Sequence, residues 1–147
     1  MSGSHAASGR VVLVDSTVWI DLLRRRVTRQ VADLRALLET REAALSFLVY
    51  QEVLQGASTP DHFERLRVYF STLPTLHVAS PRRLHEAAAK LYARCRWAGI
   101  TPRNGHDCVI AQTAIEHGVA LLANDRDFDA IASVEPRLRL YPVGRKR

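Results

Sequence analysis

The chain has 147 residues, of which 47% are hydrophobic and 24% charged, the balance of an ordinary soluble globular domain. A chain of this length folds as one domain with a substantial core, and no apolar stretch approaches the roughly 20 residues that span a bilayer, so we expect no membrane association. The net charge is +6, with 21 Lys and Arg against 15 Asp and Glu. This charge favours encounters with polyanions such as nucleic acid, although a basic surface alone does not establish a function.

The N-terminal residues and the cysteines bear on the compartment. Residues 1–10 are small and polar without an apolar segment, so they lack the pattern of a secretory signal and we expect a disordered lead-in. Cys95 and Cys108 have no CxxC spacing and fall on apolar helical faces. Buried free thiols are therefore expected rather than zinc ligands, as in a protein of the reducing cytoplasm.

Short apolar runs alternate with helical periodicity along the chain, which indicates an α/β fold in a single domain over residues 11–143, with a basic tail over 144–147. In chain order we expect strands over residues 11–15, 43–45, 76–79, 119–123 and 138–141. We expect helices over residues 18–26, 31–38, 47–54, 60–70, 81–99, 107–118 and 127–132.

Several helix starts carry capping residues. Ser16 and Thr17 offer caps for the first helix, Ser46 for the helix over 47–54, and Thr59-Pro60 and Ser80-Pro81 each place a cap before a first-turn proline. Asn104 to Asp107 has the N-x-x-D form of a variant capping box, and Asp127 is predicted to cap the helix over 127–132.

Four carboxylates lie at strand ends or on apolar helices: Asp15, Glu52, Asp107 and Asp125. Asp15 and Asp125 each follow an apolar strand, and Asp107 lies in the first turn of its helix. In a parallel sheet with right-handed crossovers, such positions share the carboxyl edge, where α/β folds bind ligands. Glu52 is one and a half turns into its helix, so that helix must pack beside the same edge.

Convergence of these groups requires a counter-charge. Two carboxylates ~5 Å apart repel by about 3 kcal/mol at an effective dielectric near 20. Four of them either bind a cation or raise their pKa values, and oxygen ligands suit Mg²⁺ or Mn²⁺. The pattern therefore predicts a metal-dependent enzyme, and hydrolysis of a phosphodiester is a reaction that such a cation assists.

Each carboxylate also has a structural interpretation. Asp15 could cap its helix, Glu52 could face solvent, Asp107 could favour the helix dipole, and Asp125 could start a turn. Asp21 is expected to face solvent. The six histidines show no ligand spacing, and His106 adjoins Asp107 and is a minor candidate for the site.

At these residues the sequence resembles the PIN-domain ribonucleases, and within them the VapC-type toxins of toxin–antitoxin modules. The matching segments are LVDSTVWID at residues 13–21, QEVLQG at 51–56, DCVIA at 107–111 with EHG at 116–118, and LLANDRDF at 121–128. The resemblance covers about residues 11–143, and the order and spacing of the motifs make it more specific than any one of them.

The resemblance implies a central, mostly parallel five-stranded sheet flanked by helices, and cleavage of RNA by a metal-activated water. Asp15 and Asp107 would be the principal ligands of Mg²⁺, or of Mn²⁺, and Glu52 and Asp125 would complete the pocket. It also implies a homodimer and neutralisation by a small VapB-type antitoxin, whose tail can place an arginine in the acidic pocket.

Contacts to an RNA substrate must come from basic residues, because an acidic pocket repels phosphate. The candidates are Arg24, Arg25, Arg26, Arg103 and the tail Arg145, Lys146 and Arg147.

The main alternative function is a catalytically inactive PIN-like module that binds RNA or a protein. A phosphatase with Asp15 as nucleophile would require an aspartate where Thr17 stands, and no glycine-rich loop supports dinucleotide binding.

Overall fold

The computed structural model describes residues 10–144 of the chain. Residues 1–9 of the expected lead-in and residues 145–147 of the expected basic tail lie outside the described part. The strands are β1 (Val12–Val14), β2 (Ala43–Ala44) and β3 (Ala120–Leu122). The helices are α2 (Ser16–Leu23), α3 (Arg29–Glu39), α4 (Phe47–Leu54), α5 (Pro60–Phe70), α6 (Pro81–Trp97), α7 (His106–His117) and α8 (Arg126–Val134).

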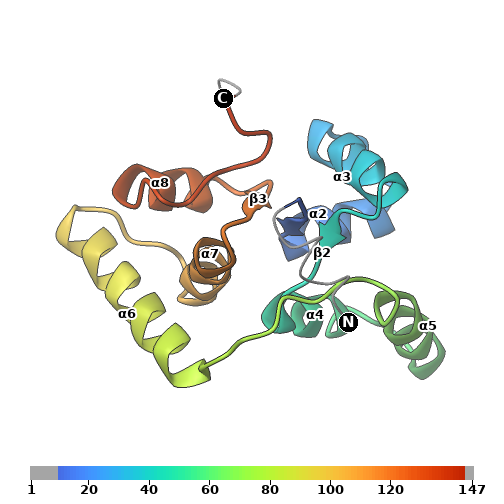
Figure 1. The fold of residues 1–147 in the computed structure, drawn as a ribbon. Coiled ribbons are helices and arrows are strands. Elements are labelled where there is room, and N and C mark those ends of the chain that lie inside the picture. The colour runs from blue at the N-terminus through green and yellow to red at the C-terminus, as the bar shows by residue number, and fades with distance from the viewer. Residues whose placement is uncertain (1–9, 145–147) are drawn as a thin grey trace.

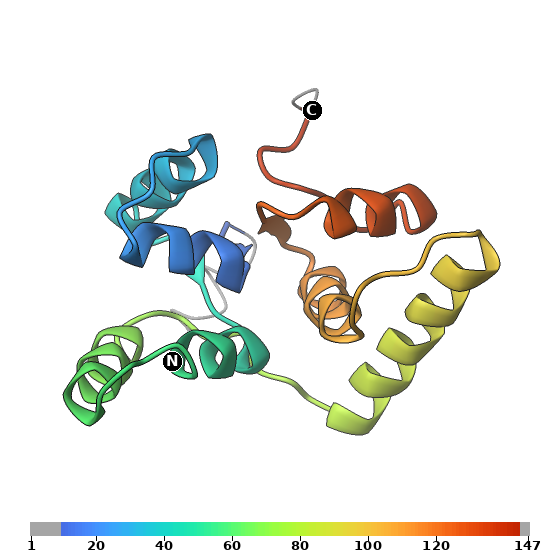
Figure 2. The ribbon, with the colours of Figure 1, turned by 180° about the vertical axis from the view of Figure 1, so that it is seen from behind.

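The strands form a parallel sheet in the order β2-β1-β3, with helices on either side of it. Figures 1 and 2 show α6, α7 and α8 on one side of the molecule and α2 to α5 on the other, with the strands between them. The predicted α/β class with a parallel sheet is thus confirmed.

The expected number of five strands is wrong for the described residues, where three strands form. The segments predicted as strands over 76–79 and 138–141 form no ladder. Isolated parallel bridges pair Leu45 with Thr75, one residue before the first segment, and Leu121 with Leu140 in the second. The first bridge extends the β2 edge and the second lies beside β3, so both segments lie at the outer edges of the sheet. An edge segment has one hydrogen-bonding neighbour instead of two, and here its pairing is too short to form a ladder.

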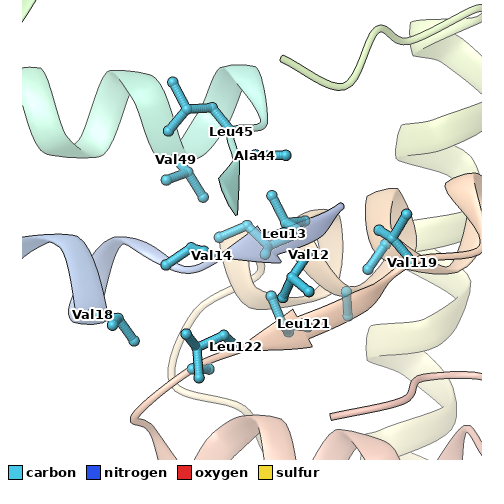
Figure 3. Close-up of a cluster of buried hydrophobic side chains, with 14 of the residues drawn as sticks. Val12, Leu13, Val14, Val18, Ala44, Leu45, Val49, Val119, Leu121 and Leu122 are labelled. Carbon is cyan, nitrogen blue, oxygen red and sulfur yellow. The ribbon is translucent and has the colours of Figure 1, made fainter. Parts of the chain in front are cut away.

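The centre of the core is β1, whose residues are buried on both faces as a central parallel strand requires. Figure 3 shows the side chains of Val12, Leu13 and Val14 between those of Ala44 and Val49 on one side and those of β3 on the other. Leu13 and Val14 are fully buried. The apolar run that predicted a central strand is therefore the strand around which the sheet is assembled.

Helix starts follow the predicted caps in three cases and differ in three. The hydroxyls of Ser46, Thr59 and Ser80 accept backbone N–H groups at the starts of α4, α5 and α6. The N-cap of α2 is Asp15 rather than Ser16 or Thr17, and the N-cap of α8 is Asp125 rather than Asp127.

The third difference is at α7, where the capping box is wrong. The N-cap is Gly105, which has no side chain, while Asn104 Oδ1 accepts the N–H of His106 at 2.9 Å. Asp107 is the second residue of the helix and makes no capping bond, so its carboxylate is left for other interactions.

An ion-pair cluster joins α6 to the end of α8. Glu135 is 5% exposed and receives Arg94 Nη1 at 2.8 Å and Arg137 Nη2 at 3.0 Å. These arginines hold the pKa of Glu135 down to about 2.

Cys95 and Cys108 are free and buried, as predicted. No helix of residues 10–144 has the length and apolar character needed to cross a membrane.

Candidate active site

The sheet brings the predicted carboxylates to one edge. Because β1 and β3 are parallel neighbours with Val14 opposite Leu122, the residues that follow them emerge together. The N–H of Asp15 donates to the Leu122 carbonyl at 2.9 Å, and the N–H of Asn124 donates to Thr17 Oγ1 at 3.4 Å. These bonds tie the start of α2 to the loop that carries Asp125.

Asp15 is the most buried carboxylate of the group, with 3% of the residue exposed. Its Oδ2 accepts two bonds from Thr17, from the hydroxyl at 2.6 Å and from the backbone N–H at 3.1 Å. Burial nevertheless raises the pKa of Asp15 to about 6, with the charge of Glu52 adding to the effect. The structural interpretation of Asp15 as a cap is therefore confirmed, while its role as a metal ligand stays a prediction.

Glu52 faces the site from α4 and does not point into solvent. Ser16 Oγ donates to Glu52 Oε1 at 2.8 Å, and His106 Nδ1 lies 3.4 Å from Oε2. Both Ser16 and His106 neighbour a predicted ligand in sequence, so Glu52 is held by the same two chain segments that carry Asp15 and Asp107.

A compact trio of carboxylates forms the open side of the site. Asp107, Asp125 and Asp127 each offer an oxygen, and these oxygens lie within 4.8 Å of one another. Burial raises the pKa of Asp107 to about 7, and the charges of the other carboxylates add to this shift. Those charges belong to Asp15, Asp125, Asp127 and Glu52. The pKa of Asp107 is thus raised by the charges of all four other carboxylates in addition to burial.

The sequence predicts that Asp127 caps the helix after Asp125, with a role at the metal site as the lesser alternative. In the structure Asp125 takes the capping role by accepting the N–H of Asp127 at 2.9 Å. A capping bond of this kind folds the first turn so that N-cap and N2 side chains lie close together. The Asp-x-Asp spacing after β3 was the available signal.

Arg103 is the predicted basic residue that lies at the site. Its guanidinium contacts Asp125 and Asp127, and its side chain is 75% exposed. Arg103 also lines a hollow of about 550 Å³ with Thr17, Asn124, Asp125, Arg126 and Asp127.

The basic segment Arg24 to Arg26 is exposed after α2, where Arg26 lies 3.6 Å from Asp21. Asp21 was expected to face solvent, but its side chain is only 15% exposed and its Oδ2 lies 3.5 Å from the amide nitrogen of Asn124.

The residues present fit a divalent cation. The donor set of Asp107, Asp125 and Asp127 consists of carboxylate oxygens, which are the ligands that Mg²⁺ and Mn²⁺ prefer. Burial is the main cause of the raised pKa values of Asp15 and Asp107, and the charges of neighbouring carboxylates add to it. A cation bound there would offset those charges and favour the ionised carboxylates.

Comparison with known families agrees with this fold. The family model described as PIN domain matches residues 12–134. The chain is 32% identical over 126 residues to the VapC ribonuclease Mb1587 of Mycobacterium bovis, covering 84% of this chain and 93% of the relative. It has the same identity and coverage with ribonuclease VapC11 of Mycobacterium tuberculosis. The chain belongs to the PIN-domain family, in its VapC group.

Solved structures share the PIN-domain fold. A toxin–antitoxin complex from Klebsiella pneumoniae gives a TM-score of 0.63 at 21% identity, covering 86% of this chain and 94% of that one. VapBC2 from Rickettsia felis, bound to a DNA fragment from its promoter, gives 0.65 at 18% identity, with coverages of 88% and 96%. The PIN-domain segments quoted from the sequence carry Asp15, Glu52, Asp107 and Asp125, and the structure gathers all four at one edge.

Proposed function

We propose that this protein is a metal-dependent endoribonuclease that hydrolyses RNA phosphodiester bonds at the acidic edge of its sheet. The observation that carries the proposal is the convergence of five carboxylates, among which burial and the charges of the other four raise the pKa of Asp107 to about 7. The ribonuclease names of its VapC relatives support RNA as the substrate class.

The roles of the side chains follow from their positions. Asp15 and Asp107 are the proposed principal ligands of Mg²⁺, with Mn²⁺ as a substitute, and Glu52 and Asp125 complete the pocket. A bound divalent cation supplies Lewis-acid polarisation of the phosphoryl oxygen and lowers the pKa of a coordinated water. Thr17 and Ser16 orient the carboxylates of Asp15 and Glu52 through their hydroxyls.

The proposed partner is a small VapB-type antitoxin, and the proposed assembly is a homodimer that acts in the cytoplasm. The antitoxin partner is supported by the similar folds of Klebsiella pneumoniae and Rickettsia felis, which were solved as a toxin–antitoxin complex and as VapBC2. The homodimer and the compartment follow from the family resemblance. We expect expression of the protein alone to arrest growth, co-expression with the antitoxin to abolish the arrest, and co-purification to give a stable complex.

The direct test is cleavage of total RNA by the purified protein in Mg²⁺, with EDTA and with Asp15→Asn as negative controls. The matched control is Asp61→Asn, an exposed acidic residue in the first turn of α5. The proposal predicts discrete products with the wild type and Asp61→Asn, and none with EDTA or Asp15→Asn. Absence of cleavage and of Mn²⁺ binding by a folded wild type would instead favour a catalytically inactive RNA- or protein-binding module.

A further inference from the structure

The acidic site already holds a cation of the chain itself. Arg103 Nη2 donates to both oxygens of Asp125, each at 3.0 Å, and Nε donates to Asp127 Oδ2 at 3.1 Å. The two carboxylates raise the pKa of Arg103, so the guanidinium remains charged at any working pH. Charge-assisted contacts of this kind are among the stronger hydrogen bonds of proteins.

These contacts engage two of the carboxylates that a divalent cation would use. Asp125 and Asp127 are two of the three carboxylates whose oxygens lie within 4.8 Å of one another. Both Asp125 oxygens are engaged by the arginine, while within residues 10–144 no hydrogen bond or ion pair joins the arginine to Asp107. The arginine therefore offsets the charge of two carboxylates of the trio and leaves the charge of the third, Asp107, without a counter-ion from Arg103.

The arginine is also free to leave. Its side chain is 75% exposed and lines an open hollow, so releasing it breaks no buried packing. Asp125 and Asp127 keep other contacts without it. The N–H of Asp127 still donates to Asp125 Oδ1 at 2.9 Å, and the backbone N–H of Arg103 still donates to Asp127 at 3.2 Å.

We propose that Arg103 is a built-in counter-ion that a divalent metal ion displaces from Asp125 and Asp127 as it binds. The proposal rests on the proposed function in one respect, that the acidic cluster takes a divalent ion. Arg103 then lowers the affinity of the site for metal, and the metal-free protein is protected from part of its own charge repulsion. The opposite role, an anchor that positions the two carboxylates for metal, predicts weaker metal binding once the guanidinium is removed.

The first experiment is a titration of Mn²⁺ into metal-free protein. The concentration of free Mn²⁺ is measured from its electron paramagnetic resonance signal. Arg103→Ala should lower the Kd for Mn²⁺ by roughly three- to tenfold, the effect of losing an exposed but multidentate ion pair. Arg126→Ala is the matched control. It removes the same charge from the same hollow, while the structure gives Arg126 no ion pair with Asp125 or Asp127. Its Kd should change by about twofold or less, through screened long-range attraction.

Equal effects of the two variants, or a higher Kd in Arg103→Ala, would overturn the proposal. Asp107→Asn separates this failure from that of the proposed function. If neither the wild type nor Arg103→Ala binds Mn²⁺ any better than Asp107→Asn, the metal site itself is refuted.

The second experiment uses the unaltered protein. The Nε–H resonance of Arg103, assigned by its loss in Arg103→Lys, should move from its hydrogen-bonded position as Mg²⁺ is added. The Mg²⁺ concentration at the midpoint of this shift change should coincide with the midpoint of Mg²⁺ binding measured by calorimetry. A resonance that stays in place through saturation would show that metal and arginine bind together, and the displacement would be refuted.

Discussion

Asp107→Asn should stabilise the metal-free protein while abolishing its metal binding. The carboxylate of Asp107 is partly buried among four others, and its pKa is raised from 3.8 to about 7. The folded protein therefore holds a proton that the unfolded chain releases at a lower pH. Stability falls as the pH rises from 3.8 to about 7. Above that window Asp107 is ionised, and the full free-energy cost of its charge, from burial and from the neighbouring carboxylates, is present.

The magnitude follows from the size of the shift. Three pKa units correspond to roughly 4 kcal/mol of differential interaction. Neighbouring carboxylates share the repulsion and Arg103 offsets part of it, so we expect about 2 kcal/mol of stabilisation in Asp107→Asn at pH 8. For a chain of this size that raises the Tm by roughly 5 °C. At pH 4 most of the gain should disappear, because the carboxyl group is protonated in the folded protein and only partly ionised in the unfolded chain.

The assay is urea unfolding in EDTA at pH 4, 6 and 8, with Asp61→Asn as the control. Asp61 lies in the first turn of α5 as Asp107 does in α7, so its substitution removes the same helix-dipole interaction without the cluster. Excess Mn²⁺ should reverse the order, because it stabilises only the wild type. If Asp107→Asn were less stable than the wild type at pH 8 in EDTA, the reasoning about repulsion would be wrong.

Three further outcomes are expected. Glu135→Gln should destabilise by about 2 kcal/mol in urea unfolding, because it leaves the two arginines without their buried anion. Glu64→Gln, in an exposed pair, should leave the stability nearly unchanged. The contribution of Glu135 should be lost as pH falls below 4.5 toward about 2, and a flat acid profile would contradict this. Leu13→Ala should cost about 3 kcal/mol in the same assay, because Leu13 is fully buried in the central strand. Thr17→Val removes the 2.6 Å hydroxyl bond to Asp15, so the pKa of Asp15 should rise further and Mn²⁺ binding should weaken several-fold at pH 6 but less at pH 8; equal losses at both would count against this role.

The sequence by itself determined the local elements and the candidate carboxylates. The apolar run at Val12–Val14 can only be a strand buried on both faces, and the cap-and-proline pairs at Thr59 and Ser80 start α5 and α6 where predicted. These features depend on residues near in sequence. The same local logic located Asp15, Glu52, Asp107 and Asp125 on strand ends and apolar helices.

Only the tertiary structure decided how those groups meet. The N–H of Asp127 donates to the capping carboxylate of Asp125, which brings Asp127 into the trio. Arg103 binds Asp125 although it lies 22 residues before it in the chain. The hydrogen bond from Ser16 to Glu52 and the contact of His106 with Glu52 likewise join distant segments. Such contacts depend on the packing of α4, α7 and α8 around one sheet edge, where a residue's partner is set by the path of the backbone in space. Periodicity and capping patterns describe the chain only within a few residues, so they carry no information about which distant side chain will neutralise a charge.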